Sequence, residues 1–181
     1  MPPKPPPLPE AVYQRVMTVA KVEGYSILIV AGFSAFMAAG GGNVFTAIAA
    51  CLAAGTGAME IHGAQQLARG DETAVRWLVR AQLLLMAIIL AYVFWQLAHF
   101  SEAVVREWLP EFRRLTDEIS AQQNIENPYA RFTDTQLVHL ARVLHTTLYC
   151  IVGIVTCVYQ GLMARYYHRR REAIAQALAD A

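Results

Sequence analysis

The sequence predicts an all-α protein: a four-helix transmembrane bundle with an amphipathic helical segment in the long connection between the third and fourth helices. The first observation is composition. Hydrophobic residues make up 56% of the 181 residues and charged residues 16%, against about 45–50% and about 25% in a typical soluble domain. The second is patterning, because residues 24–59, 81–101 and 143–164 contain no charged side chain. A bilayer core of about 30 Å requires about 20 apolar helical residues, so these runs predict membrane crossings.

The first charge-free run is too long for one crossing, since about 36 helical residues would span about 54 Å. It contains Gly40-Gly41-Gly42-Asn43, which is a strong helix breaker. We therefore expect a helical hairpin on either side of the glycines. The four helices expected within a transmembrane domain at 23–167 span 23–40, 44–66, 75–99 and 141–166, with 100–137 as a connection outside the cytoplasm.

Residues 1–22 are predicted to form a Pro-rich tail followed by an interfacial helix. The run PPKPPPLP favours extended polyproline geometry and is typical of a spacer. Beyond it, Val12, Val16 and Val19 share one helical face. This segment fits either a helix at the membrane surface or an extension of the first crossing.

The turn between the second and third helices is predicted at Arg69-Gly70-Asp71. Gly70 can adopt the left-handed conformation that ends a helix, and the Asp71 carboxylate can cap the next helix. The second helix is thus expected to extend to about Ala68.

In the third connection, Pro110 suits the first turn of a helix. Leu109, Phe112, Leu115 and Ile119 then repeat at helical spacing, which predicts an amphipathic helix about 12 residues long. It should end at 124–128, and Thr133 with Gln136 forms a capping-box pattern before the last helix. This helix could lie on the membrane surface, cap the bundle or bind a partner.

The basic residues predict the orientation. With both termini in the cytoplasm, ten of them fall on the cytoplasmic side: Lys4, Arg15, Lys21, Arg69, Arg76, Arg80, Arg165, Arg169, Arg170 and Arg171. The positive-inside rule favours this arrangement. Residues 168–181 would form a basic cytoplasmic helix, and a bacterial inner membrane is the expected location.

Few residues in the apolar runs could carry chemistry. Glu60 and His62 are the candidate ion or proton site, because ionisable groups close to hydrocarbon are costly and often functional. The alternative is that Glu60 forms an ion pair with Arg80 or Arg76. The sequence contains no catalytic motif and no metal-ligand spacing, and we expect no metal and no cofactor.

Small residues dominate the helix expected at 44–66. Ala47, Ala50, Ala54 and Ala58 recur at helical spacing, together with Gly55. Small side chains let membrane helices approach closely, so this helix is predicted to pack against other helices.

We therefore expect a non-enzymatic membrane protein that acts by helix–helix assembly, as a homo-oligomer or as a subunit of a membrane complex. One alternative is a homo-oligomeric channel or a transporter of ions or small solutes. Another is a b-type cytochrome subunit, since five histidines are available as haem ligands. The partners would be the lipid bilayer and other membrane subunits. A net charge of +1 gives no indication of nucleic-acid binding.

Overall fold

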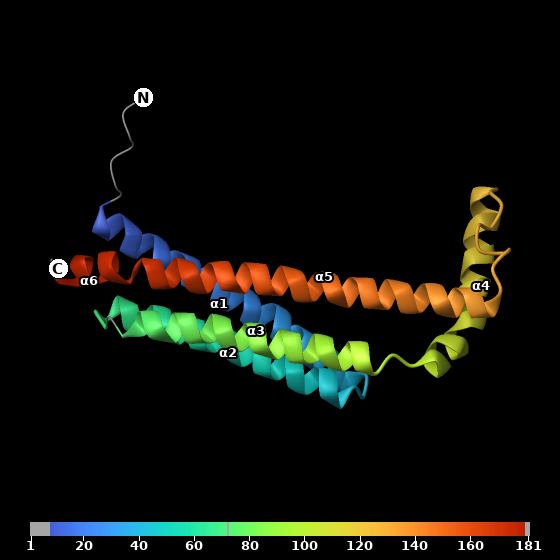
Figure 1. The fold of residues 1–181 in the computed structure, drawn as a ribbon, viewed down its shortest axis with the longest axis horizontal. Coiled ribbons are helices and arrows are strands. Elements are labelled where there is room, and N and C mark those ends of the chain that lie inside the picture. Colours follow the sequence, from blue (N-terminus) through green and yellow to red (C-terminus); the bar gives the residue numbers. More distant parts are fainter. Residues whose placement is uncertain (1–7, 72, 180–181) are drawn as a thin grey trace, which may run out of the picture. The chain divides into compact units, whose positions relative to one another are not determined.

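The computed structural model describes residues 8–71 and 73–179, and within these ranges the regular structure is entirely helical (Figure 1). The helices are α1 (Pro9–Gly40), α2 (Val44–Ala68), α3 (Ala74–Ala98), α4 (Glu102–Gln123), α5 (Asp134–Arg169) and α6 (Arg171–Ala179). Helices α1, α2 and α3 and the segment Asp134–Ala179 are long and apolar enough to cross a membrane. The predicted all-α class with four long apolar helices is therefore confirmed. Most of the Pro-rich run lies outside the described residues.

The chain divides into two compact units. The first comprises the described residues of Met1–Tyr92 and Gly153–Ala181, and the second is Val93–Val152. Each unit is described by itself.

In the first unit, α1 and α2 form the predicted hairpin (Figure 1). Gly42 has a φ of 73°, a left-handed conformation that glycine adopts without strain. The Asn43 side chain then caps α2 by accepting a hydrogen bond from the Thr46 amide at 3.1 Å. Helix α1 is continuous from Pro9, so residues 9–22 prolong the first apolar helix.

Two glycines bring α1 and α2 into backbone contact. A Cβ atom added to Gly57 would lie 2.7 Å from the Gly24 carbonyl oxygen, and one added to Gly24 would lie 2.9 Å from the Gly57 carbonyl oxygen. A side chain at either position would overlap with backbone. The same contact places Gly24 beside Glu60, since the added Cβ would be 3.1 Å from the Glu60 Cβ.

The turn between α2 and α3 has the predicted helix end and the predicted left-handed glycine, whereas Asp71 bonds the amide that precedes α3. Helix α2 ends at Ala68, and Gly70 has a φ of 85°. The Asp71 carboxylate accepts a hydrogen bond from the Thr73 amide at 2.8 Å. Hydrogen bonds from the side chain and backbone of Thr73 lower the pKa of Asp71.

An apolar core at one end of the first unit joins five helices. Its fully buried side chains are Val16, Ala20, Ala64, Leu67, Ala74, Val75, Leu78, Tyr167 and Ile174. The Tyr13 hydroxyl closes its edge by donating to the Leu67 carbonyl oxygen at 3.2 Å.

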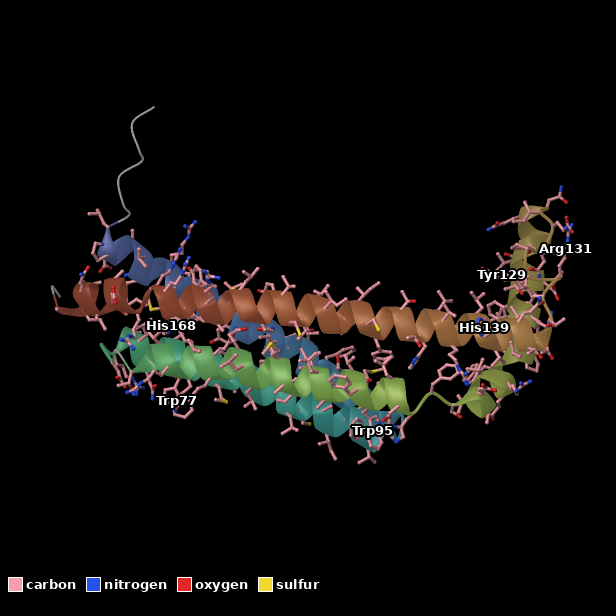
Figure 2. The ribbon with its side chains drawn as sticks, in the orientation of Figure 1. Trp77, Trp95, Tyr129, Arg131, His139 and His168 are labelled. Carbon is pink, nitrogen blue, oxygen red and sulfur yellow. The ribbon has the colours of Figure 1, made fainter. Side chains whose placement is uncertain are left out.

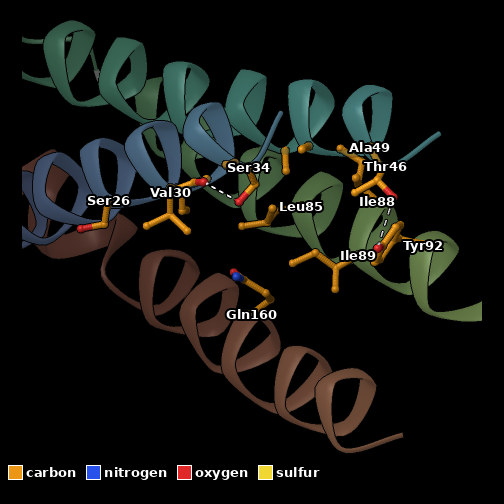
Figure 3. Close-up of a pocket in the computed structure, with 14 residues that line it drawn as sticks. Ser26, Val30, Ser34, Thr46, Ala49, Leu85, Ile88, Ile89, Tyr92 and Gln160 are labelled. Atoms are coloured by element: carbon orange, nitrogen blue, oxygen red, sulfur yellow. Dashed lines mark hydrogen bonds between the residues drawn. The ribbon is translucent and has the colours of Figure 1, made fainter. Parts of the chain in front are cut away.

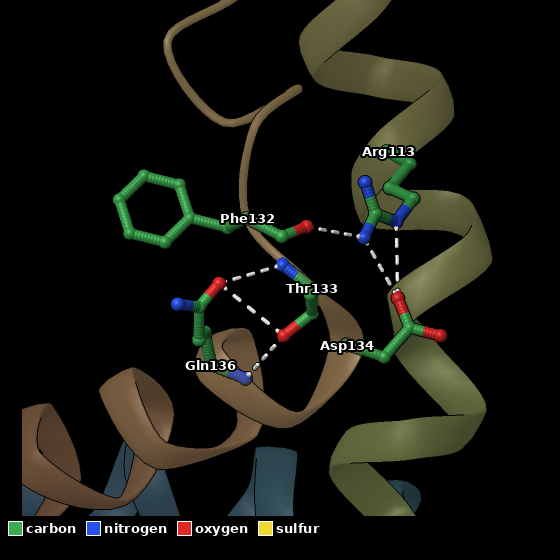
Figure 4. A network of polar contacts seen from close by, with 5 residues as sticks. All are labelled: Arg113, Phe132, Thr133, Asp134 and Gln136. Atoms are coloured by element: carbon green, nitrogen blue, oxygen red, sulfur yellow. Dashed lines mark hydrogen bonds and ion pairs between the residues drawn. The ribbon is translucent and has the colours of Figure 1, made fainter.

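In the second unit, α4 packs on the first turns of α5 through Leu109, Leu137 and Val138. Arg113 donates to the Asp134 carboxylate at 2.7 Å and to the Phe132 carbonyl oxygen at 2.9 Å (Figure 4). These contacts fix the start of α5 against the middle of α4.

The predicted length of α4 was wrong. The helix has 22 residues rather than about 12, and Pro110 lies inside it rather than in its first turn. Its start is set two turns earlier by Ser101, whose hydroxyl accepts a hydrogen bond from the Val104 amide at 3.4 Å. The predicted end is confirmed, because Asn124 adopts a left-handed conformation with a φ of 53°.

The predicted capping box is also confirmed (Figure 4). The Thr133 amide donates to Gln136 Oε1 at 2.9 Å, and the Gln136 amide donates to Thr133 Oγ1 at 3.3 Å. Helix α5 consequently begins at Asp134, before the apolar run that we expected to start near 141.

Candidate functional site

A group of buried polar side chains, which we call the acid cluster, lies in the first unit. It consists of Glu23 on α1, Glu60 on α2, Gln82 on α3 and Tyr167 on α5. Their exposed fractions are 8%, 1%, 0% and 0%. Four helices thus each contribute one buried polar side chain to the acid cluster.

Hydrogen bonds join the acid cluster in two pairs. Gln82 Nε2 donates to Glu60 Oε1, and the Tyr167 hydroxyl donates to Glu23 Oε2 at 3.3 Å. The pairs lie close together, because the Gln82 amide also lies beside the Glu23 carboxyl group and the two carboxyl groups interact electrostatically.

Three oxygens of the acid cluster remain as unused acceptors. Glu23 Oε1, Glu60 Oε2 and Gln82 Oε1 are buried and accept no hydrogen bond from any described residue. A buried acceptor without a donor is energetically costly. The two carboxyl oxygens can therefore accept a proton, and all three oxygens can coordinate a cation, with a gain in free energy.

Among the described residues, no basic side chain forms an ion pair with Glu23 or Glu60. The alternative in which Glu60 pairs with Arg76 or Arg80 is not what the structure shows, since Gln82 bonds Glu60 and both arginines are exposed. Arg80 is two residues from Gln82, which turns it about 200° around α3 and away from the core.

The structure separates the two residues that the sequence indicated as an ion site. Glu60 is buried, whereas His62 is exposed and lies with Nε2 3.0 Å from Gln66 Nε2. The His62 ring also meets Trp77 edge-on, with 6.2 Å between centroids. Glu60 is instead grouped with Glu23, Gln82 and Tyr167, which the sequence did not single out.

The small residues of α2 fall on different faces. Ala47, Ala50 and Ala54 are partly buried within the chain, whereas Gly55 and Ala58 are exposed. A Cβ atom added to Gly55 would meet no atom within 4 Å. The close contact with α1 is made by Gly57 instead, and packing of Gly55 or Ala58 against a second chain stays a prediction.

A pocket of about 590 Å³ lies between α1, α2, α3 and α5 (Figure 3). Its lining is mostly aliphatic, and the Gln160 side chain points into it (Figure 3). A second pocket of about 420 Å³ is lined by Glu23 and Tyr159. The two pockets share Ser26, Ile27 and Gln160 and therefore adjoin one another.

The histidines are dispersed. His168 is exposed near α6 (Figure 2), and His99 Nδ1 lies 2.9 Å from the Trp95 carbonyl oxygen. Within the described ranges, no three His, Cys, Asp or Glu side chains are grouped so that they could hold a metal ion. The cytochrome alternative stays a prediction.

Comparison of the chain with protein-family models, with curated proteins and with solved structures found no match. Because a fold can host many functions, the chemistry of the acid cluster and its pockets is the basis for a functional assignment.

Proposed function

We propose that the chain is a small transporter of a cell membrane. It carries its coupling ion on the acid cluster, and this ion is a proton or a monovalent cation. The observation that carries this proposal is the pair of buried carboxyl groups, Glu23 and Glu60, with an unused oxygen on each. Ionisable groups are retained inside membrane proteins chiefly where protons or ions bind.

The four long apolar helices support insertion into a bilayer. The distribution of Lys and Arg supports cytoplasmic termini in a bacterial inner membrane, with α4 on the opposite side. In this orientation the acid cluster lies toward the cytoplasmic half, because Glu60 is close to the α2–α3 turn.

The kind of ion that Glu23 and Glu60 can bind follows from the burial of both carboxyl groups without a basic partner among the described residues. Two negative charges in one low-dielectric site repel each other, and their loss of hydration is costly. A proton or a single cation between them offsets both effects. The oxygen atoms available as ligands belong to carboxyl, amide and phenol groups, which suit a proton or a hard cation such as Na⁺.

Infrared spectroscopy of the purified protein tests proton binding directly. We expect a carboxylic-acid band that appears on acidification and is lost in both Glu23→Gln and Glu60→Gln. Glu107→Gln, which removes an exposed carboxyl group on α4, is the matched control and should leave this band unchanged. Binding of radioactive Na⁺ or K⁺ is measured in parallel. If neither the band nor cation binding depends on Glu23 or Glu60, the proposed function is wrong.

Assembly is a second candidate function, and the exposed small-residue face of α2 favours it. Cys51, Gly55 and Ala58 are exposed at helical spacing, so a second helix could approach them closely. We expect the protein to have the mass of an oligomer or complex in mild detergent, and Gly55→Leu to reduce that mass. A monomeric mass for the wild type would contradict assembly as a homo-oligomer.

A further inference from the structure

The two adjoining pockets have a composition that selects for one kind of ligand. The larger pocket presents mainly aliphatic side chains, among them Ile27, Val30, Leu85, Ile88 and Ile89. Its volume of about 590 Å³ falls within the range of about 300–1,000 Å³ that holds small organic ligands. An apolar molecule would therefore fit between α1, α2, α3 and α5.

The two serine hydroxyl groups in the larger pocket add little polarity. Ser26 Oγ donates to the Val22 carbonyl oxygen and Ser34 Oγ to the Val30 carbonyl oxygen, each at 2.8 Å (Figure 3 shows the second). Their protons are thus used within α1. Gln160 Oε1, in contrast, is buried and accepts no hydrogen bond from the described residues.

The second pocket supplies a charge. Of the residues that line the second pocket, only Glu23 and the Tyr159 phenol can ionise. The lining of the larger pocket contains no Asp, Glu, Lys or Arg. A negative ligand would be repelled by Glu23 and would find no basic partner. A positive ligand would be attracted by the carboxyl group and could also contact the face of Tyr159.

We propose that the two pockets together bind a lipophilic monovalent cation, a molecule with an apolar body and a single positive charge. The apolar body occupies the larger pocket, and the charged group lies beside Glu23 at the shared wall of Ser26, Ile27 and Gln160. This inference rests on the proposed function, because the ligand and the coupling ion compete for the same carboxyl pair. A proton is displaced when the cation binds and returns when the cation leaves.

Tetraphenylphosphonium is a suitable probe, and its binding to the full-length protein in detergent can be measured by equilibrium dialysis. We expect saturable binding that tightens as pH rises, since fewer protons then compete. Glu23→Gln should weaken binding at least about tenfold, which corresponds to about 1.4 kcal/mol.

A pocket-filling variant provides a test that leaves both carboxyl groups in place. Ala49 lines the larger pocket (Figure 3), so Ala49→Leu should weaken binding of the probe while leaving the infrared carboxyl band intact. Ala87→Leu places the same side chain on an exposed position of α3 and should bind the probe as the wild type does.

The outcomes separate the two proposals. If the wild type shows no saturable binding of the probe, or if neither Glu23→Gln nor Ala49→Leu weakens it, the inference is wrong. If the Glu23- and Glu60-dependent infrared band is still present, the ion site itself stands. If the probe does not bind and neither the infrared band nor Na⁺ or K⁺ binding depends on Glu23 or Glu60, the proposed function is wrong as well.

Discussion

The Tyr167 hydroxyl donates a hydrogen bond to Glu23 Oε2 at 3.3 Å, between residues that are 144 positions apart in the chain. Both side chains are buried. This bond connects α5 to α1 and gives one oxygen of Glu23 a donor, while Glu23 Oε1 has none among the described residues. Tyr167 therefore both positions the carboxyl group and stabilises the packing of the last long helix.

Tyr167→Phe should destabilise the first unit by about 1–3 kcal/mol, the cost of leaving a buried acceptor unsatisfied. The ring remains in the apolar core, so packing is preserved. Thermal unfolding in mild detergent measures the effect. Tyr25→Phe, at an exposed position of α1, is the control and should unfold at the wild-type temperature. Equal stability of the wild type and Tyr167→Phe would show that the bond contributes nothing.

Two glycines of α2 should respond in opposite ways to the same substitution. Gly57→Ala places a Cβ 2.7 Å from the Gly24 carbonyl oxygen, and overpacking of this kind costs about 1–3 kcal/mol. Gly55→Ala meets no neighbouring atom and should stabilise the helix by up to about 1 kcal/mol, because alanine has the higher helix propensity.

Thermal unfolding of the two variants tests this contrast directly. The close contact also holds Glu23 near Glu60, so Gly57→Ala should weaken ion binding and Gly55→Ala should not. If the two variants are equally stable, the α1–α2 contact is not as close as the structure has it.

Much of the fold could be predicted because it depends on local chemistry. The Gly40–Asn43 break, the Gly70 and Asp71 turn and the Thr133–Gln136 cap each depend on side chains within a few residues of one another. The start of α4 was missed because Ser101 was read as the end of an apolar run rather than as a cap.

The acid cluster was only partly predictable. Glu60 stood out as the end of a charge-free run, and Glu23 ends the same run on its other side. Glu23 lies as far before Gly40 as Glu60 lies after Asn43, so a straight hairpin places them at the same depth. That symmetry was available in the sequence. The contributions of Gln82 and Tyr167 were not, because they depend on how α3 and α5 are rotated against the hairpin.

Helix α4 is predicted to rest on the bilayer surface through its exposed apolar side chains. These include Val104, Trp108, Leu115 and Ile119, and Trp favours the membrane interface. In a variant whose only tryptophan is Trp108, brominated lipids should quench its fluorescence. Moving the tryptophan to position 106, about 200° around the helix, should abolish most of the quenching. Equal quenching at both positions would contradict an interfacial α4.

Asp71 should make stability depend on pH in the acid range. Hydrogen bonds from Thr73 lower the pKa of its carboxyl group. The folded state therefore gains stability above the ordinary pKa of aspartate and loses it as pH falls through the lowered value. Asp71→Ala removes this hydrogen-bond acceptor, so its unfolding temperature should lie below that of the wild type at neutral pH and approach it in acid. A difference that is constant with pH would exclude this contribution.

Glu60→Gln distinguishes a functional carboxyl group from a structural one. A buried carboxylate without a basic partner costs more free energy than a neutral amide of the same shape. The substituted Gln can still accept the hydrogen bond from Gln82 through its own Oε1, as Glu60 does.

Residues retained for binding are often suboptimal for stability. We therefore expect Glu60→Gln to unfold at the wild-type temperature or above it, while losing the infrared carboxyl band and the pH dependence of probe binding. Glu107→Gln, at an exposed position, should change neither property. A marked fall in unfolding temperature for Glu60→Gln, with ion and probe binding unchanged, would instead assign Glu60 to the packing of α2 against α3.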